Sequence, residues 1–235
     1  MARLVIPTLM YHSVAADSRD YLTVSTQVFE SHVRHLADAC TVVGIRDMLN
    51  PHFDRVPDRP VAITFDDSLR NALDQAVPIL EAFAQPATFF VIAGTIGQTN
   101  AWDTKAYQIL DHMTVEDLQY LARKGFEIGG HSVTHQRLTK LPLEHIEHEV
   151  RQSKEMLTRI LDREPVAFAY PYGDADERCR QICARHYPLG FASVRQGVFD
   201  WREEPTNIRR IYVSPDDGVV ELDRKIEAYR NFLPC

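Results

Sequence analysis

Short β-prone runs alternate with longer amphipathic segments along the whole chain, and this alternation limits the possible folds more than any other feature of the sequence. The run Val61–Phe65 is apolar enough for a buried strand, and the residues after it, Leu69, Leu73, Val77 and Leu80, repeat at helical spacing. Strands that alternate with helices build a mainly parallel sheet covered by helices on the outside. We therefore expect an α/β fold.

The same patterns place the remaining elements. We expect strands at Leu4–Tyr11, Thr41–Val43, Val61–Phe65, Ala87–Ile92, Phe126–Ile128, Val166–Ala169, Leu189–Val194 and Ile208–Val213. We expect helices from Ser25 to Cys40, Ser68 to about Leu80, Thr114 to Arg123, Leu143 to Leu161, Asp176 to His186 and Val219 to Phe232, with a brief helical turn at Ile45–Leu49. The chain has 235 residues and no internal repeat or dividing linker, so we expect one domain over residues 1–235.

Composition excludes some classes of partner. A net charge of −7 argues against nucleic acid or an anionic membrane, and leaves a carbohydrate or a small N-acylated molecule as a compatible substrate. No stretch of about 18 apolar residues occurs, so we expect no membrane span. The segment Met1–Tyr11 lacks the charge of a signal peptide and contains Pro7, so a cytoplasmic location is expected if Met1 is the native start. The four cysteines lack zinc-ribbon or redox spacing, as expected of free thiols in a reducing compartment. No pattern in the sequence fixes the oligomeric state.

Acids and histidines follow two of the expected strands. Asp66 and Asp67 come directly after Val61–Phe65, and His131 and His135 follow a short strand that ends in two glycines. Because the carboxyl ends of parallel strands meet at one edge, these side chains are expected to converge. One carboxylate and two imidazoles, from Asp67, His131 and His135, make a three-ligand set that leaves positions open, which is typical of catalytic zinc. The two histidines face the same way if the segment forms a helical turn.

Asp66 suits a different role from that of its neighbour. Adjacent side chains diverge in extended structure, so one acid can ligate while the other faces the water on the metal and takes its proton. Two other interpretations compete with this one: the acids form a helix N-cap pair before Ser68, or they belong to the nucleophile motif of a haloacid-dehalogenase phosphatase. The phosphatase motif requires a second Asp two residues after the first, and position 68 is Ser.

These motifs, together with the turn Tyr170-Pro171-Tyr172-Gly173, resemble the polysaccharide deacetylase (NodB-homology, carbohydrate esterase family 4) family. The resemblance implies a single-domain distorted (β/α) barrel. It also implies a metal-dependent hydrolase that removes N-acyl groups, N-acetyl foremost, from an amino sugar with metal-bound water as nucleophile. In the family's pattern Asp66 is the general base, Asp67, His131 and His135 bind the metal, and the Tyr172 N–H stabilises the oxyanion. Zinc is the leading metal, and cobalt, nickel or iron(II) also suits these ligands.

Three departures from the family pattern stand out. Ala169 occupies the place of an arginine that orients the base, Asp200-Trp201 is only a loose counterpart of the fourth motif, and no histidine follows His186 to act as general acid. Met10-Tyr11-His12-Ser13 resembles the N-terminal signature of poly-N-acetylglucosamine deacetylases. The resemblance therefore implies His12 as the acid that protonates the leaving amine.

Other candidates complete the predicted site. Arg210 on the last expected strand can supply the missing cation, and Arg209 replaces it if the strand register slips by one. We expect Pro171, Tyr172, Trp102 and Trp201 to contact substrate; Trp102 lies in a long irregular stretch that can present an aromatic platform.

Two other functions are compatible with the same motifs. One is a deacylase of the same fold that acts on a small natural-product or lipid-linked intermediate. The other is a non-catalytic, metal-containing carbohydrate-binding protein, against which the intact Asp66 counts.

Overall fold

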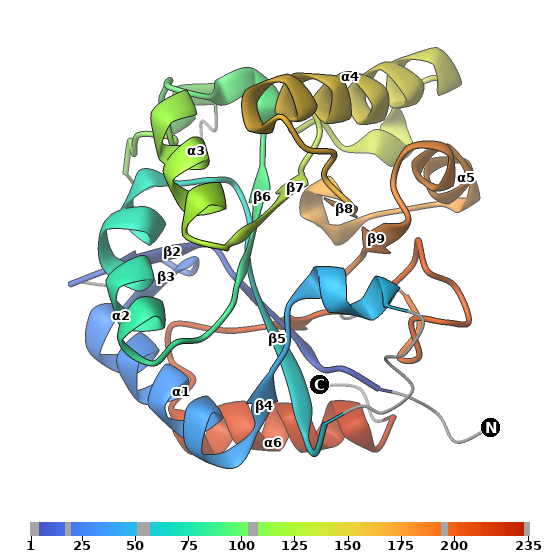
Figure 1. The fold of residues 1–235 in the computed structure, drawn as a ribbon. Helices are drawn as coiled ribbons and strands as arrows, with labels where there is room; N and C mark the ends of the chain where they lie inside the picture. The colour runs from blue at the N-terminus through green and yellow to red at the C-terminus, as the bar shows by residue number, and fades with distance from the viewer. Residues whose placement is uncertain (1–4, 17–19, 51–56, 103–107, 194–196, 233–235) are drawn as a thin grey trace.

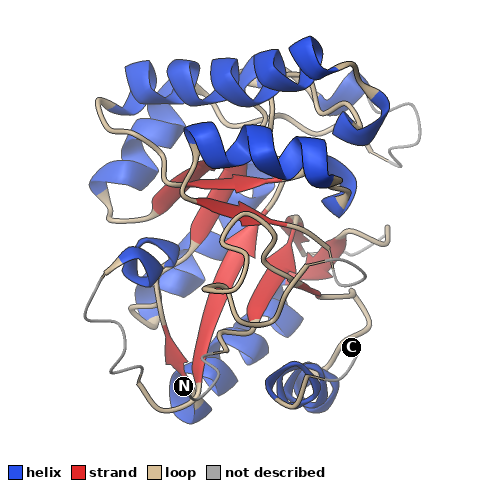
Figure 2. Ribbon diagram, turned by 90° about the vertical axis from the view of Figure 1, so that its right-hand side faces the viewer, coloured by secondary structure: helices blue, strands red, loops and turns tan. Residues whose placement is uncertain are grey.

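The computed structural model describes residues 5–16, 20–50, 57–102, 108–193 and 197–232. A strongly curled parallel sheet lies at the centre, and helices cover its outer side (Figure 1 and Figure 2). The strands run in the order β10-β1-β5-β6-β7-β8-β9, with β4 paired to β5. Their bounds are β1 Thr8–Tyr11, β4 Thr41–Val42, β5 Pro60–Phe65, β6 Thr88–Val91, β7 Glu127–Gly130, β8 Ala167–Ala169, β9 Leu189–Phe191 and β10 Ile211–Tyr212. The predicted parallel α/β architecture is confirmed.

One segment near the C-terminus joins the two edges of the sheet. β10 pairs with β1, while Ile208, three residues earlier, donates to the carbonyl of Gly190 at 2.8 Å and accepts from the N–H of Ala192 at 2.7 Å beside β9. Because this segment touches both edges, the sheet curls into the distorted barrel expected for this class of fold.

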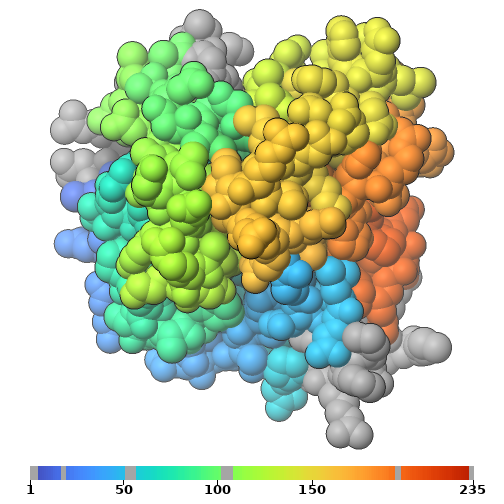
Figure 3. All heavy atoms as spheres, turned by 45° about the horizontal axis from the view of Figure 1, so that its top comes forward, coloured from blue at the N-terminus to red at the C-terminus, as the bar shows by residue number. Residues whose placement is uncertain are grey.

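Six α-helices of the described residues pack outside the sheet: α1 Thr26–Ala39, α2 Val77–Ala82, α3 Val115–Arg123, α4 Leu143–Leu161, α5 Glu177–His186 and α6 Val219–Arg230. The first residues of two expected helices are N-caps: the Ser25 side chain accepts from Val28 N at 3.2 Å, and Thr114 forms a capping box with Asp117. α3 and α4 lie side by side at the surface (Figure 3), and Gln119 of α3 donates to the carbonyl of Ile160.

The core is built from strands that are buried on both faces. All six residues of β5 are buried, as expected for a central parallel strand between two layers of side chains. Phe65 at its end stacks on Phe89 of β6 with ring centroids 4.9 Å apart and on Tyr11 of β1 at 5.5 Å. This aromatic stack fixes the ends of three adjacent strands beneath the site.

None of the described helices combines the length and the apolar character that a membrane span needs.

Several boundaries differ from the predicted ones. The helix after the acid pair begins at Arg70 and passes through a π-helical turn at Ala72–Ala76. It does not begin at Ser68, because Asp67 and Ser68 adopt left-handed φ values of 68° and 52°, which are not helical. β9 and β10 are shorter than expected, and a small parallel pair, β2 (Ser13–Ala15) with β3 (Thr23–Ser25), was not predicted.

Candidate active site

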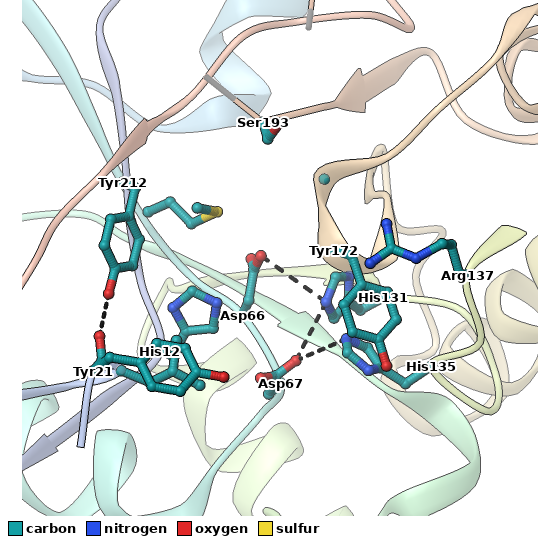
Figure 4. Close-up of a pocket in the computed structure, with 13 residues that line it drawn as sticks. His12, Tyr21, Asp66, Asp67, His131, His135, Arg137, Tyr172, Ser193 and Tyr212 are labelled. Carbon is teal, nitrogen blue, oxygen red and sulfur yellow. Dashed lines mark hydrogen bonds and ion pairs between the residues drawn. The ribbon is translucent and has the colours of Figure 1, made fainter. Parts of the chain in front are cut away.

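Side chains from several strand ends meet in one pocket of about 340 Å³ (Figure 4). His12 follows β1, Asp66 and Asp67 follow β5, and His131 follows β7. Tyr172 comes from the turn after β8. The parallel topology explains this convergence, since all these strands present their carboxyl ends to the same side of the sheet.

Three potential metal ligands lie at the centre of the pocket. Asp67 Oδ1 is 3.3 Å from His131 Nε2 and 3.3 Å from His135 Nε2, and the three donor atoms lie within 4.8 Å of one another. Ligands about 2.1 Å from a tetrahedral zinc ion are about 3.4 Å apart. The Asp67 Oδ1 atom is buried and accepts no hydrogen bond from the described residues. This converging donor set fits a divalent metal.

The orientation of His131 is set by backbone groups. Its main-chain N–H donates to Val91 O at 2.8 Å, and its ring Nδ1 donates to the carbonyl of Ala169 at 2.7 Å. Donation from Nδ1 leaves the Nε2 lone pair to face Asp67, as in metal-binding histidines whose second nitrogen is hydrogen-bonded. Ala169 stands where the family pattern has an arginine, and here its carbonyl oxygen accepts the hydrogen bond that orients the His131 ring.

A buried ion pair holds Asp66. Arg210, with no exposed surface, donates from its two terminal nitrogens to the two carboxylate oxygens of Asp66 at 2.6 and 2.7 Å. The register explains the meeting, because Leu9 of β1 pairs with both Ile63 and Ile211. Arg209 points elsewhere: it donates to Gly197 O and lies over the Phe199 ring. Arg210 therefore supplies the cation that position 169 lacks.

The pKa values of the two acids respond to opposing effects. Burial alone raises the pKa of the Asp66 carboxyl, but the charges of Arg210 and His131 outweigh it and hold that pKa below its ordinary value. Burial also opposes ionisation of Asp67, but His135 and His131 lower its pKa well below the usual range. Both carboxylates are therefore ionised at neutral pH, as a general base and a metal ligand require.

The two imidazoles differ in the metal-free protein. Burial lowers the pKa of His135 to about 4, despite the opposing charge of Asp67, so its ring is neutral and can donate a lone pair. Burial also disfavours the charged form of His131, but Asp66 and Asp67 outweigh it and raise the pKa of His131.

The local backbone differs from the predicted one at both motifs. The segment from His131 to His135 is not a helical turn, because Ser132 and His135 have left-handed φ values of 66° and 57°. Asp67 is likewise left-handed rather than extended, so Asp66 and Asp67 do not diverge as expected. Asp66 Oδ2 lies 3.9 Å from the same His131 Nε2 atom that Asp67 approaches. Tight loops, rather than regular elements, bring the acids and imidazoles together.

Tyr172 stands at the rim of the pocket. It has a φ of 60° within the short 3-10 turn Pro171–Gly173, and its side chain is half exposed. Its ring centroid lies 4.8 Å from that of His135, and the guanidinium carbon of Arg137 lies 4.4 Å from the Tyr172 ring centroid. The ring therefore contacts both a candidate metal ligand and a cation at the pocket wall (Figure 4).

The other predicted site residues are placed differently. His12 is half-buried and lines the pocket, with its ring 6.4 Å from that of Tyr212. Pro171 is buried in its turn and is not among the described residues that line the pocket, so the predicted contact with substrate is not supported. Trp201 packs against an apolar core cluster and is not among the described residues that line the pocket. The side chain of Trp102 lies outside the described residues.

Sequence reasoning missed part of the pocket wall. Tyr21, Arg137, Ser193 and Tyr212 also line it. Arg137 follows His135 by two residues and could have been found from that spacing. The others come from segments distant in the sequence and carry no motif.

Comparison with known proteins agrees with this geometry. The family model for polysaccharide deacetylase matches residues 54–187. A Staphylococcus aureus poly-beta-1,6-N-acetyl-D-glucosamine N-deacetylase is 27% identical over 233 residues, which cover 94% of this chain and 77% of that protein.

Solved structures share the fold. The Streptococcus pyogenes deacetylase PplD, solved in complex with acetate, superposes with a TM-score of 0.83 at 24% identity, covering 96% of this chain and 99% of that one. IcaB from Ammonifex degensii gives a TM-score of 0.78 at 22% identity, covering 95% and 97%.

Proposed function

The chain belongs to the polysaccharide deacetylase family, and from this premise we propose that it is a metal-dependent hydrolase that removes N-acetyl groups from an amino-sugar polymer. The observation that carries the proposal is the Asp67, His131 and His135 donor set beside the paired Asp66 carboxylate, in a pocket open to solvent. The name of the S. aureus relative makes a β-1,6-linked N-acetylglucosamine chain the first substrate to test.

Asp67, His131 and His135 hold the metal in this proposal, with zinc the first candidate and cobalt, nickel or iron(II) compatible. A divalent ion held there would lower the pKa of a water molecule toward about 7 and would polarise the acyl carbonyl.

Asp66 acts as the general base. Its carboxylate is ionised and held in one orientation by the two bonds from Arg210, so it can accept a proton from the attacking water without first rearranging. The backbone N–H of Tyr172 donates to the oxyanion that develops on the acyl oxygen. His12, on the opposite side of the pocket from Tyr172 (Figure 4), donates a proton to the departing amine.

The test is acetate release by zinc-loaded protein from four substrates: β-1,6-linked N-acetylglucosamine oligomers, chitooligomers, monomeric N-acetylglucosamine and small N-acetyl amides. We expect release from oligomers, abolished by chelation and restored by zinc. Acetate release from the small N-acetyl amides alone would indicate that the protein is a small-molecule deacylase instead. Absence of release from every substrate, with metal bound, would favour a non-catalytic carbohydrate-binding protein.

A further inference from the structure

Glu149 of α4 is a buried carboxylate that the proposed chemistry does not use. Its residue is only 5% exposed. Its Oε2 accepts the main-chain N–H groups of Val133 and Thr134 at 2.8 and 2.9 Å, and its Oε1 accepts the Thr134 hydroxyl at 2.7 Å. All three donors belong to the segment from His131 to His135, which we call the histidine loop. Glu149 thus binds the loop that carries two of the candidate metal ligands.

The histidine loop requires support from outside. Ser132 and His135 both adopt the left-handed backbone region, which non-glycine residues rarely occupy unless their surroundings impose it. On the side of β6, Ala93 N donates to Ser132 O and Gly94 N donates to Val133 O, each at 2.9 Å. These bonds satisfy carbonyl oxygens of the loop, and the Glu149 carboxylate accepts hydrogen bonds from N–H groups of the loop on the opposite side. The loop is therefore held between the end of β6 and α4.

The two histidines depend on this support to different extents. His131 has anchors of its own, through its N–H to Val91 O and its ring to Ala169 O. The main-chain N–H of His135 donates to Ser132 Oγ at 2.9 Å, which is within the same loop. The backbone of His135 is therefore coupled directly to the conformation of the loop.

We propose that Glu149 is a positioning residue that holds His135 in place to bind the metal and thereby sets the metal affinity. This inference rests on the proposed function only in taking Asp67, His131 and His135 as the metal ligands. Glu149 touches neither metal nor substrate in this account; it acts through the backbone of the histidine loop.

Two variants separate geometry from charge. Glu149→Ala removes all three bonds. Glu149→Gln removes the charge but keeps a carbonyl oxygen for the two N–H groups, and its amide can donate to the Thr134 hydroxyl. Glu155→Ala is the matched control, because Glu155 lies on the same helix and forms a partly exposed pair with Arg151 and a bond with Gln152, away from the histidine loop.

The experiment is a Co²⁺ titration of the metal-free full chain, followed by visible absorption and repeated with zinc in competition. We expect Glu149→Ala to weaken Co²⁺ binding about 10- to 100-fold, as loss of an outer-shell partner does in other metal sites. Its absorption bands should shift as His135 leaves the ion. Glu149→Gln should keep the wild-type spectrum, and Glu155→Ala should match the wild type in both respects.

Wild-type affinity and spectrum in Glu149→Ala would overturn the proposal. Equal losses in Glu149→Gln and Glu149→Ala would also overturn it, because charge and not loop geometry would then act. If Glu149→Ala does not fold, Glu149→Asp, which shortens the side chain by one methylene and keeps the charge, must weaken binding. Failure of the wild-type protein itself to bind Co²⁺ would instead contradict the proposed function.

Discussion

Asp66 combines two roles at the scale of a single residue, since it is a partner in a buried ion pair and the proposed general base. Asn at position 66 cannot accept the proton, but it keeps the side-chain volume and one carbonyl oxygen for Arg210. We expect Asp66→Asn to retain metal and fold, with a lower melting temperature because a buried cation loses its charged partner. Its rate of acetate release should fall by ~10²–10⁴. Near-normal turnover with full metal occupancy would assign the base to another group.

His12 provides a second test at the residue scale. If it protonates the leaving amine, His12→Ala should slow hydrolysis of an amide by ~10²–10⁴ while an activated ester, whose leaving group needs no proton, is nearly unaffected. His148→Ala, on the exposed side of α4, serves as the control histidine. Equal losses on both substrates in the metal-loaded variant would make His12 a structural residue.

The residues with chemistry were easier to predict than their geometry. Asp66, Asp67, His131 and His135 could be found because each follows a recognisable strand. Their local backbone could not, because left-handed φ values at Asp67, Ser132 and His135 are imposed by tertiary contacts and not by residue preference. Glu149 has no sequence signal, since an acid on an amphipathic helix ordinarily faces solvent.

At the scale of elements, helix α1 carries a buried titratable group. His32 is fully buried; its Nε2 donates to the carbonyl of Asp217 at 2.8 Å, so its Nδ1 accepts from the Tyr11 hydroxyl at 3.1 Å. Because one ring nitrogen donates and the other accepts, the imidazole of His32 is neutral in this arrangement. Burial lowers the pKa of His32 below its ordinary value of 6.5, although the Asp217 carbonyl and charge oppose the shift.

This pKa shift predicts how stability depends on pH. The unfolded chain takes up a proton at His32 below about pH 6.5, whereas the folded protein does not until a lower pH, so the free energy of unfolding falls as pH decreases through that range. One such proton changes it by up to about 1.4 kcal/mol per pH unit. Denaturation measured at several pH values between 7 and 5 tests this. The free energy of unfolding should change less steeply with pH in His32→Gln than in the wild type. An unchanged pH dependence in His32→Gln would contradict this account.

Element prediction succeeded where the periodicity was strong. The long amphipathic helix expected at roughly Leu143 to Leu161 agrees with α4, whereas the last strand was overestimated, since β10 contains Ile211–Tyr212. The short β2–β3 pair could not be predicted, because its residues pair across a connection and lack alternation of their own.

At the scale of the whole molecule, alternating strands and helices predicted a parallel sheet with its site at the carboxyl ends. The order of the strands could not be obtained from alternation alone, because the last strand returns to pair with the first. That return brings Arg210 to Asp66 across 144 residues of sequence. The choice between Arg209 and Arg210 therefore depended on the closure of the barrel.

The central claim is that Asp67, His131 and His135 bind one divalent metal at the mouth of this barrel. Anomalous diffraction at the zinc absorption edge, from crystals grown with zinc, tests it most directly. We predict a peak about 2.0–2.2 Å from a carboxylate oxygen of Asp67 and from Nε2 of both histidines. A zinc peak on other residues, with none between these three at saturating zinc, would contradict the claim.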